Sequence, residues 1–277
     1  MPDLVRDVVI VALTLLTTTL GSLGGLGGAI LLVPLLSFVD ISIAQAAPLG
    51  LVSVIAGSVA AAQRHIGDAT VNHRFAVVTE LAASSGAIVG VLLAGRMSEQ
   101  ALTIFLALVA LTAAVLGARR KGTRWKMDPT LGSDAVGERH GSLAGAYRLD
   151  DGVVPYQPSR MKLGVALMSI AGVVTGLAGV GGGFLKTPLS SEVMKLPVKV
   201  AAATSTFTIG FTASTAFILM ALDGRVVLSD AALVVLGSIV GGMIGSQLQG
   251  RLAPPVVRRS TAVLLVVVAV ALFGRAL

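Results

Sequence analysis

The sequence predicts an all-α, polytopic integral membrane protein built from two repeated halves. Apolar residues make up 55% of the 277-residue chain, charged residues only 13%, and the mean hydropathy is +0.90. Soluble domains carry about 25% charged residues, so this composition indicates lipid rather than water around the chain. Long apolar stretches and an internal repeat support the same fold class.

Eight apolar stretches approach or exceed the length that a helix needs to cross the hydrocarbon core, which is about 20 residues. They are residues 8–38, 43–62, 75–94, 101–118, 163–191, 200–222, 228–248 and 256–273. The first stretch has no clear basic segment before it and no small-residue cleavage pattern after it. We therefore expect it to be part of the membrane domain and not a signal peptide.

The basic charge concentrates in one hydrophilic segment. The formal net charge is +7, and nine of the 21 Lys and Arg residues lie within residues 119–162. Because cytoplasmic loops carry an excess of Lys and Arg, this segment is predicted to be a cytoplasmic linker between an N-terminal repeat (1–118) and a C-terminal repeat (163–277). No repeated alternation of aromatic and basic residues and no known binding pattern accompanies the charge, so no nucleic-acid partner is expected. The absence of cysteine excludes disulfides and thiolate metal sites.

Two pairs of motifs indicate the duplication. GLGGAILLVPLLSFV (25–39) and GVGGGFLKTPLSSEV (179–193) share the pattern G-x-G-G-x-x-L-x-x-P-L-x-S-x-V. GAIVGVLLAGR (86–96) and GGMIGSQLQGR (241–251) share G-x-x-x-G-x-x-x-x-G-R. Inside an apolar span, G-x-x-x-G usually permits close helix packing, and this is our interpretation of the second pair.

Each glycine–proline motif predicts a break in its apolar stretch. In a helix interior Gly costs nearly 1 kcal/mol and Pro about 3 kcal/mol, and broken backbone at membrane depth must be buried in protein or line a cavity. Residues 8–38 as one helix would be roughly 46 Å long, against a core of about 30 Å. We therefore favour re-entrant hairpins, with arms 8–20 and 29–38 in one copy and 163–175 and 184–191 in the other, each arm reaching about halfway.

Charge counting favours the hairpins over eight straight crossings. The hairpins place 16 Lys and Arg residues on the cytoplasmic side and 4 outside, whereas straight crossings place 14 and 6. Each copy then has three crossings plus one hairpin. Because three is odd, the two copies would be inverted, as in transporters whose broken helices meet near the membrane midplane.

The predicted breaks suit a small anion, because glycine-rich backbone ahead of a helix leaves N–H groups unpaired and the helix dipole adds positive charge. Lys186 lies one turn beyond the second glycine cluster, where the first copy has Leu32. An intramembrane charge is by default a functional residue, so we expect Lys186 to bind the ligand and not to snorkel to the headgroups. The candidate backbone donors are Gly25, Gly27, Gly28, Gly179, Gly181, Gly182 and Gly183.

Hydroxyl side chains also distinguish the second copy. Thr187 stands opposite Val33, and TSTFT (204–208) stands opposite GLVSV (50–54). Thr and Ser in membrane helices often bond only to their own backbone, so the alternative for each is a structural role. The hydroxyl candidates are Thr187, Thr204, Ser205, Thr206 and Thr208.

Glu80 is the candidate for a buried carboxylate, with Ser84 one turn further along the same helix face. It is a candidate to carry a coupling proton, and the alternative is a pair with Arg74 or Lys186. His65 and His73 flank a short loop, where we expect them to be solvated.

The duplicated glycine–proline motif, the eight apolar segments and the hydrophilic linker resemble the TauE/SafE sulfite and sulfonate exporter family. The resemblance covers the chain apart from the linker, and the first copy departs from it in having Ala29 where the second has Gly183. It implies a multi-pass transporter of a bacterial or archaeal cytoplasmic membrane. The expected function is export of sulfite or of sulfonates such as sulfoacetate, coupled to an ion gradient.

Two other functions remain as alternatives. A passive anion channel would use the same pore chemistry. An intramembrane enzyme is less expected, because the spans contain no cysteine, no histidine and essentially one carboxylate from which to build a catalytic site. We expect no cofactor and no metal; the expected partners are a small organosulfur or sulfur oxyanion and membrane lipid, and the sequence leaves the oligomeric state open.

Overall fold

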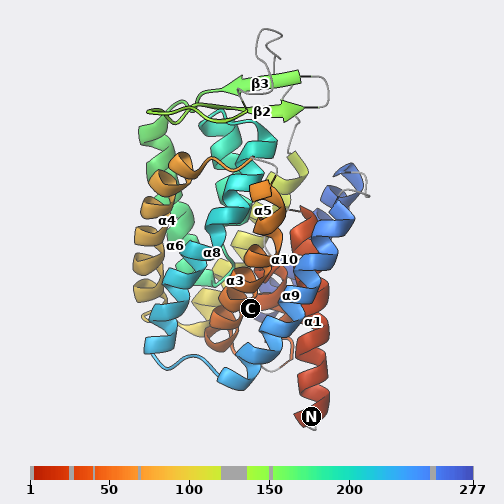
Figure 1. Ribbon diagram of the computed structural model, residues 1–277. Helices are drawn as coiled ribbons and strands as arrows, with labels where there is room; N and C mark the ends of the chain where they lie inside the picture. Colours follow the sequence, from red (N-terminus) through yellow and green to blue (C-terminus); the bar gives the residue numbers. More distant parts are fainter. Residues whose placement is uncertain are drawn as a thin grey trace.

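The computed structural model is a bundle of long helices with a small antiparallel sheet at one end (Figure 1). It describes residues 3–24, 28–39, 41–67, 70–119, 136–149, 152–249 and 254–276. The elements in chain order are α1 (Asp3–Gly24), α2 (Ala29–Ser37), α3 (Ile43–Gly67), α4 (His73–Ala94), α5 (Glu99–Arg119), β1 (Gly137–Glu138), β2 (Gly145–Leu149), β3 (Gly152–Tyr156), α6 (Met161–Ala178), α7 (Gly183–Pro188), the π-helical turn η2 (Leu189–Val193), α8 (Val198–Leu222), α9 (Leu228–Gln249) and α10 (Pro254–Ala276).

Among these residues, eight helices are long and apolar enough to cross a membrane: α1, α3, α4, α5, α6, α8, α9 and α10. The outward faces are apolar as well. On α4, Leu81 and Leu92 are exposed, whereas Ala83 and Ala87 of the same helix are fully buried. A surface of this kind is stable in lipid and not in water, so the predicted all-α polytopic membrane protein is confirmed.

Both glycine–proline segments double back along the bundle. In the first, a Cβ at Gly28 would lie 2.6 Å from the Cα of Thr18, so α2 starts beside the C-terminal third of α1. In the second, the backbone N–H of Ser159 donates to the carbonyl of Met194 at 2.8 Å. The chain therefore enters α6 and leaves η2 at the same end of the bundle.

The arms of these hairpins are unequal, and the expected half-length first arms, 8–20 and 163–175, were wrong. α1 has 22 residues and α6 has 18, or roughly 33 and 27 Å at 1.5 Å per residue. Each first arm continues past its predicted end because a neighbouring helix packs along it. The returning arms are short, with 9 residues in α2 and 6 in α7.

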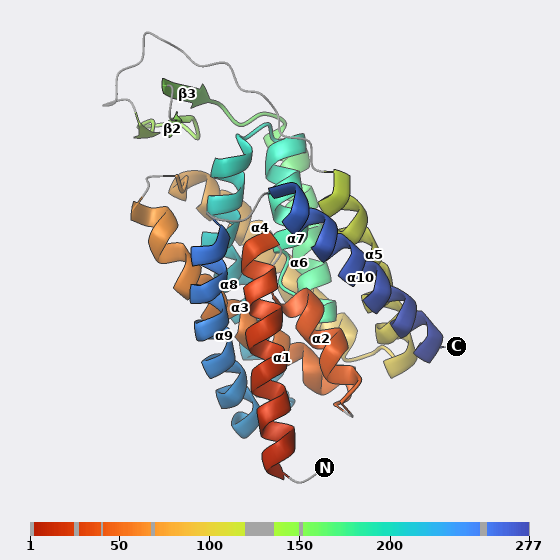
Figure 2. The same ribbon diagram turned by 90° about the vertical axis from the view of Figure 1, so that its right-hand side faces the viewer.

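The two G-x-x-x-G motifs bring helices into backbone contact, which confirms their interpretation as packing motifs. A Cβ at Gly86 would lie 1.9 Å from the carbonyl oxygen of Ser169 in α6, and one at Gly245 would lie 2.6 Å from that of Thr19 in α1. Each motif therefore joins its helix to the first helix of the other copy: α4 packs on α6, and α9 packs on α1 (Figure 2).

α1 and α6 run in opposite directions along the bundle. α1 rises from the end of the bundle that lies opposite the sheet, and α6 descends from the sheet (Figure 1). α9 runs parallel to α1, because Arg6 near the start of α1 forms an ion pair with Asp230 near the start of α9. α4 runs parallel to α6, since Ala83 contacts Gly172 and Ala87 contacts Gly176 further along both helices.

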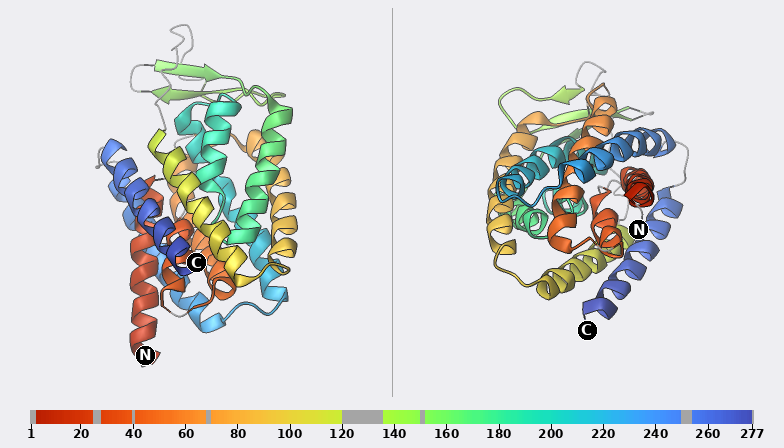
Figure 3. Two further views of the ribbon diagram at one scale, coloured as in Figure 1. Left: turned by 180° about the vertical axis from the view of Figure 1, so that it is seen from behind. Right: turned by 90° about the horizontal axis from the view of Figure 1, so that it is seen from below.

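A three-stranded antiparallel sheet in the order β1-β2-β3 was not predicted. It lies within the segment expected to be a linker, and its position at one end of the bundle is clear in the views of Figure 3. Tyr147, Val154 and Tyr156 of the sheet pack with Phe75 of α4 and Met194 in a common apolar cluster. The segment therefore has its own apolar face, and the division into two repeats and a linker stays a prediction.

The cysteine-free sequence allows a direct test of the hairpins. We expect cysteines introduced at Leu4 and Asp223 to react with a membrane-impermeant maleimide in intact cells, and one at Gln157, beside the sheet, to react only after lysis. Labelling is measured by gel shift, with lysed cells as the control for reactivity. Protection of Leu4 and Asp223 in intact cells would instead support straight crossings, which place both with the linker.

Candidate functional site

The loop that precedes α7 requires glycine for its backbone conformation. Gly179 (φ 67°) and Gly181 (φ 60°) lie in the left-handed region, which residues with a Cβ rarely adopt. Space is also lacking, because a Cβ at Gly179 would lie 2.4 Å from Ala47 and one at Gly181 2.6 Å from Val54. The loop therefore lies directly against α3. The backbone N–H groups of Gly179 and Gly183 donate to the carbonyls of Thr175 and Gly181 in this conformation.

The two interruptions approach each other at Gly50 of α3. A Cβ there would lie 2.5 Å from the carbonyl oxygen of Gly179 and 3.4 Å from the Cβ of Ala29, the first residue of α2. Gly28 is buried beside this point. Gly25 and Gly27, which were also predicted to line the site, lie outside the described residues.

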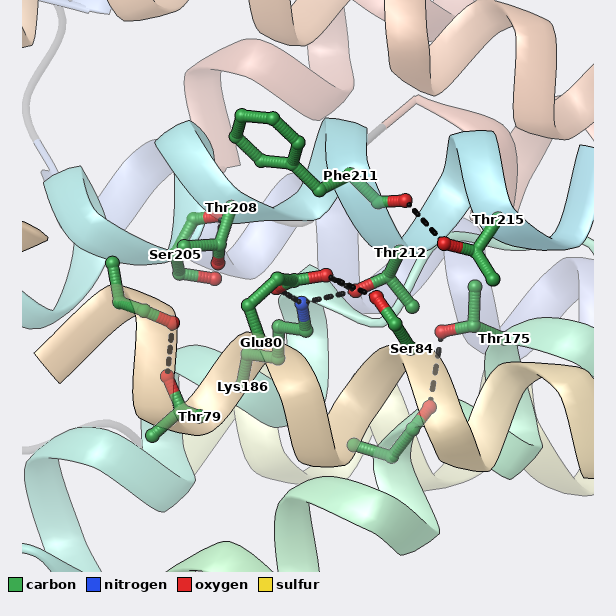
Figure 4. Close-up of polar contacts among 12 residues, drawn as sticks. Thr79, Glu80, Ser84, Thr175, Lys186, Ser205, Thr208, Phe211, Thr212 and Thr215 are labelled. Carbon is green, nitrogen blue, oxygen red and sulfur yellow. Dashed lines mark hydrogen bonds and ion pairs between the residues drawn. The ribbon is translucent and has the colours of Figure 1, made fainter.

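Lys186 on α7 lies inside the bundle, where its side chain is 3% exposed. Its Nζ donates to Oε2 of Glu80 on α4 at 2.6 Å and to Oγ1 of Thr212 on α8 at 2.5 Å (Figure 4). Thr212 lies 14 residues into α8, or roughly 21 Å from its start, which is near the middle of the helix. The predicted intramembrane charge is therefore held by an ion pair to α4 and a hydrogen bond to α8, which together join three elements.

The Glu80 carboxylate accepts further hydrogen bonds. Its Oε1 accepts from Oγ of Ser84 at 3.1 Å and from Oγ1 of Thr212. Of the two pairing alternatives for Glu80, the structure has Lys186, because Arg74 lies 3.8 Å from Glu138 of β1 instead. The same carboxylate of Glu138 lies 2.9 Å from Nδ1 of His73.

Two buried hydroxyls, on the same two elements as Lys186 and Thr212, have no hydrogen-bond partner among the described residues: Oγ1 of Thr187 on α7 and Oγ of Ser205 on α8. Thr187 is 1% exposed and Ser205 is 5% exposed. Buried polar atoms in proteins are nearly always bonded, and leaving one unbonded costs about 1–3 kcal/mol. These two hydroxyls are therefore suited to receive a ligand.

The other predicted hydroxyls of α8 have different surroundings. Thr204 accepts from the backbone N–H of Asn72 at 3.0 Å, which ties the start of α8 to the start of α4. Thr208 donates to the carbonyl of Ser205 at 3.3 Å, the structural role that was the alternative for it. Thr206 is half-buried. Figure 4 shows Ser205 and Thr208 on the same side of α8 as Thr212, whereas the ring of Phe211 points away from Glu80.

Sequence reasoning missed Thr212 and Asn72. Thr212 continues the spacing of Thr204 and Thr208 by one more turn, so a search for hydroxyls at every fourth residue would have found it. Asn72 caps α4 by accepting from the N–H of Phe75 at 2.8 Å, and it donates to the hydroxyl of Tyr156 at 3.1 Å. The second contact depends on the sheet, which the sequence analysis did not predict.

The fold and this buried ion pair define a class: a multi-pass membrane protein with a charged, hydroxyl-rich site between its helices. The family model described as "Sulfite exporter TauE/SafE" matches residues 10–272. The chain therefore belongs to the TauE/SafE family of membrane transporters. It is similar to the probable membrane transporter protein YunE of Bacillus subtilis (strain 168), with 24% identity over 258 residues that cover 88% of this chain and 89% of YunE. No solved structure matches the chain.

The buried ion pair predicts how variants of Lys186 and Glu80 change the free energy of unfolding. Lys186→Ala or Glu80→Ala alone leaves one buried charge unpaired, which costs about 3–5 kcal/mol. The double variant Lys186→Met/Glu80→Gln removes both charges, so we expect it to recover most of this loss. Thermal unfolding of purified protein in detergent measures the three values.

Arg225→Ala is the matched control for this pattern. It breaks the Arg225–Asp223 pair, in which the Asp223 side chain is 52% exposed, and exposed pairs contribute less than about 1 kcal/mol. Equal losses for Arg225→Ala and Lys186→Ala would contradict a desolvated ion pair at Lys186.

Proposed function

We propose that this transporter exports small sulfur-containing anions, sulfite or sulfonates such as sulfoacetate, across a bacterial or archaeal cytoplasmic membrane. The observation that carries the proposal is Lys186, a buried ammonium on a re-entrant segment, together with the unpartnered buried hydroxyls of Thr187 on α7 and Ser205 on α8. A transported anion needs a cation in the hydrocarbon region, where the charge would otherwise be costly.

The donors match the chemistry of a sulfonate, which has three oxygens and one negative charge. Lys186 supplies the positive charge, and Thr187, Ser205 and Thr212 supply hydroxyl donors. Charge-assisted hydrogen bonds of this kind are short and about twice as strong as neutral ones. Further proposed contacts are Thr204, Thr206 and Thr208 and the backbone of Gly25, Gly27, Gly28, Gly181 and Gly182. The N–H groups of Gly179 and Gly183, which were also predicted to bind the anion, already donate to carbonyls and would have to exchange those bonds.

We infer that the two copies form inverted repeats, with the sheet and the linker on the cytoplasmic side. The opposite directions of α1 and α6, and the exchange of packing partners between the copies, support this inference. Inverted repeats permit alternating access, in which one bundle rocks against the other around a fixed central site. Glu80 is the proposed carrier of the coupling proton, and a passive channel would lack such a group. We propose no catalytic role for the site.

The central test is transport by a Lys186→Ala variant. We expect it to reduce efflux of radiolabelled sulfite or methanesulfonate from loaded proteoliposomes at least about tenfold, because the anion loses its only counter-charge in the proposed site. Lys199→Ala is the matched control, since Lys199 is an exposed lysine at the start of α8. Equal rates for the two variants would remove Lys186 from the pathway.

The unpartnered hydroxyls give a second test, which separates function from folding. Thr187→Val and Ser205→Ala remove buried polar atoms that lack a partner, so we expect the unfolding temperature to stay the same or to rise. The same variants should lower the affinity for methanesulfonate, measured as the concentration for half-maximal efflux. A fall in unfolding temperature with unchanged efflux would show that both hydroxyls are structural.

A further inference from the structure

Three hydrogen-bond donors converge on the carboxylate of Glu80. They are the ammonium of Lys186 at 2.6 Å, the hydroxyl of Ser84 at 3.1 Å and the hydroxyl of Thr212. They come from α7, α4 and α8, and together they engage both carboxylate oxygens. This is the donor set that a small free oxyanion would need: one cation and several hydroxyls around two or three oxygens.

We propose that Glu80 is a tethered substitute for the transported anion, so that its carboxylate occupies the place that the anion's charged head takes during transport. This inference rests on the proposed function. It adds that Glu80 and the transported anion compete for Lys186. A free anion can bind Lys186 only after the Glu80 carboxylate has left it. Because a tethered group has an effective concentration in the millimolar range or above, the competition is strong.

The exposure and the ion pairs of the described residues favour an exchangeable Glu80 carboxylate over a permanent structural pair. The Glu80 side chain is 13% exposed against 3% for Lys186, so the carboxylate lies on the more accessible side of the contact. Arg74 and His73, the other basic groups near the start of α4, lie against Glu138. The unpartnered hydroxyls of Thr187 and Ser205 offer additional donors to an anion larger than a carboxylate.

The exchange balances charge when one proton accompanies each monovalent anion. The paired Glu80 carboxylate and Lys186 ammonium take up one proton from water and one anion, and yield a neutral Glu80 carboxylic acid and an anion paired with Lys186. The site is neutral before and after. Transport through it is therefore electroneutral. Because the proton and the anion move in the same direction, export is driven by the outward gradient of the anion and not by an inward proton gradient. The site accepts the head group of any small oxyanion, including a carboxylate.

The test is chemical rescue of the site by formate. In purified full-length Glu80→Ala, the donors around Lys186 lose their carboxylate, so we expect formate to bind at least about tenfold more tightly than to the wild type, in which the competitor is present. Formate should also raise the unfolding temperature of Glu80→Ala more than that of the wild type. Isothermal titration and thermal unfolding in detergent measure the two effects.

Glu192→Ala is the matched control, because it removes an exposed carboxylate from the same re-entrant segment. It should bind formate as weakly as the wild type. The double variant Glu80→Ala/Lys186→Met should lose the tighter formate binding of Glu80→Ala. Formate binding to Glu80→Ala that is no tighter than to Glu192→Ala overturns the proposal.

A second variant serves if Glu80→Ala does not fold. Glu80→Gln keeps the size of the side chain but removes the charge and replaces one acceptor oxygen by an NH2 donor, so methanesulfonate should bind it at least about tenfold more tightly than the wild type at neutral pH. Wild-type affinity should rise by up to about tenfold per unit fall in pH, as expected for one coupled proton, whereas Glu80→Gln should show no such dependence. Parallel pH profiles for the two proteins overturn the proposal.

These outcomes are distinguishable from failure of the proposed function. If formate binds Glu80→Ala more tightly but Lys186→Ala does not change sulfite efflux, the site binds anions but sulfite export through it is contradicted. If Lys186→Ala impairs efflux but formate does not bind Glu80→Ala more tightly, Lys186 belongs to the transport site and the role of Glu80 as a competitor is contradicted.

Discussion

The need to neutralise an ammonium inside the membrane is the constraint on which the central structure depends. α7 has only six residues, too few for a helix that is stable by itself. The Lys186 contacts attach it to α4 through Glu80 and to α8 through Thr212. The ion pair therefore does two things at once: it satisfies a buried charge, and it fixes the short returning arm between two full-length helices. An anion that replaced Glu80 at Lys186, as proposed, would therefore also change how the arm is held.

Close backbone contacts at glycine hold the helices and the loop before α7 in the positions that bring Lys186 to Glu80. The G-x-x-x-G helices lie against their partners with no side chain between them, and the loop before α7 lies against α3 in the same way at Gly179 and Gly181. Without a hydrophobic effect between helices in lipid, small residues at such contacts allow the packing that holds the bundle together. These contacts join the first helix of each copy to the other copy, so neither half forms its full set of helix contacts alone.

The sequence predicted the parts of the structure that have a repeating chemical signal. Apolar length identified the eight spans, paired glycines identified the packing motifs, and an isolated charge identified Lys186, which was one of the two pairing alternatives considered for Glu80. Three features escaped prediction. The lengths of α1 and α6 depend on neighbouring helices, the role of Thr212 depends on how α8 is rotated toward α4, and the sheet depends on an apolar face within a segment whose overall composition is polar. Each is set by tertiary contacts that composition and motif spacing do not report.

The two copies share a framework but differ in chemistry at matching positions. Aligned through their G-x-x-x-G motifs, Glu80 and Ser84 stand opposite Val235 and Ile239. Both of these line an apolar groove of about 720 Å³ between α3, α8 and α9. Lys186 likewise stands opposite Leu32, which is fully buried in the apolar core. The duplication thus supplies two similar scaffolds, each with one charged group of the pair: Glu80 in the first copy and Lys186 in the second. The buried ion pair therefore joins the two halves inside the bundle, because each half contributes one of its two charges and neither half can neutralise its own.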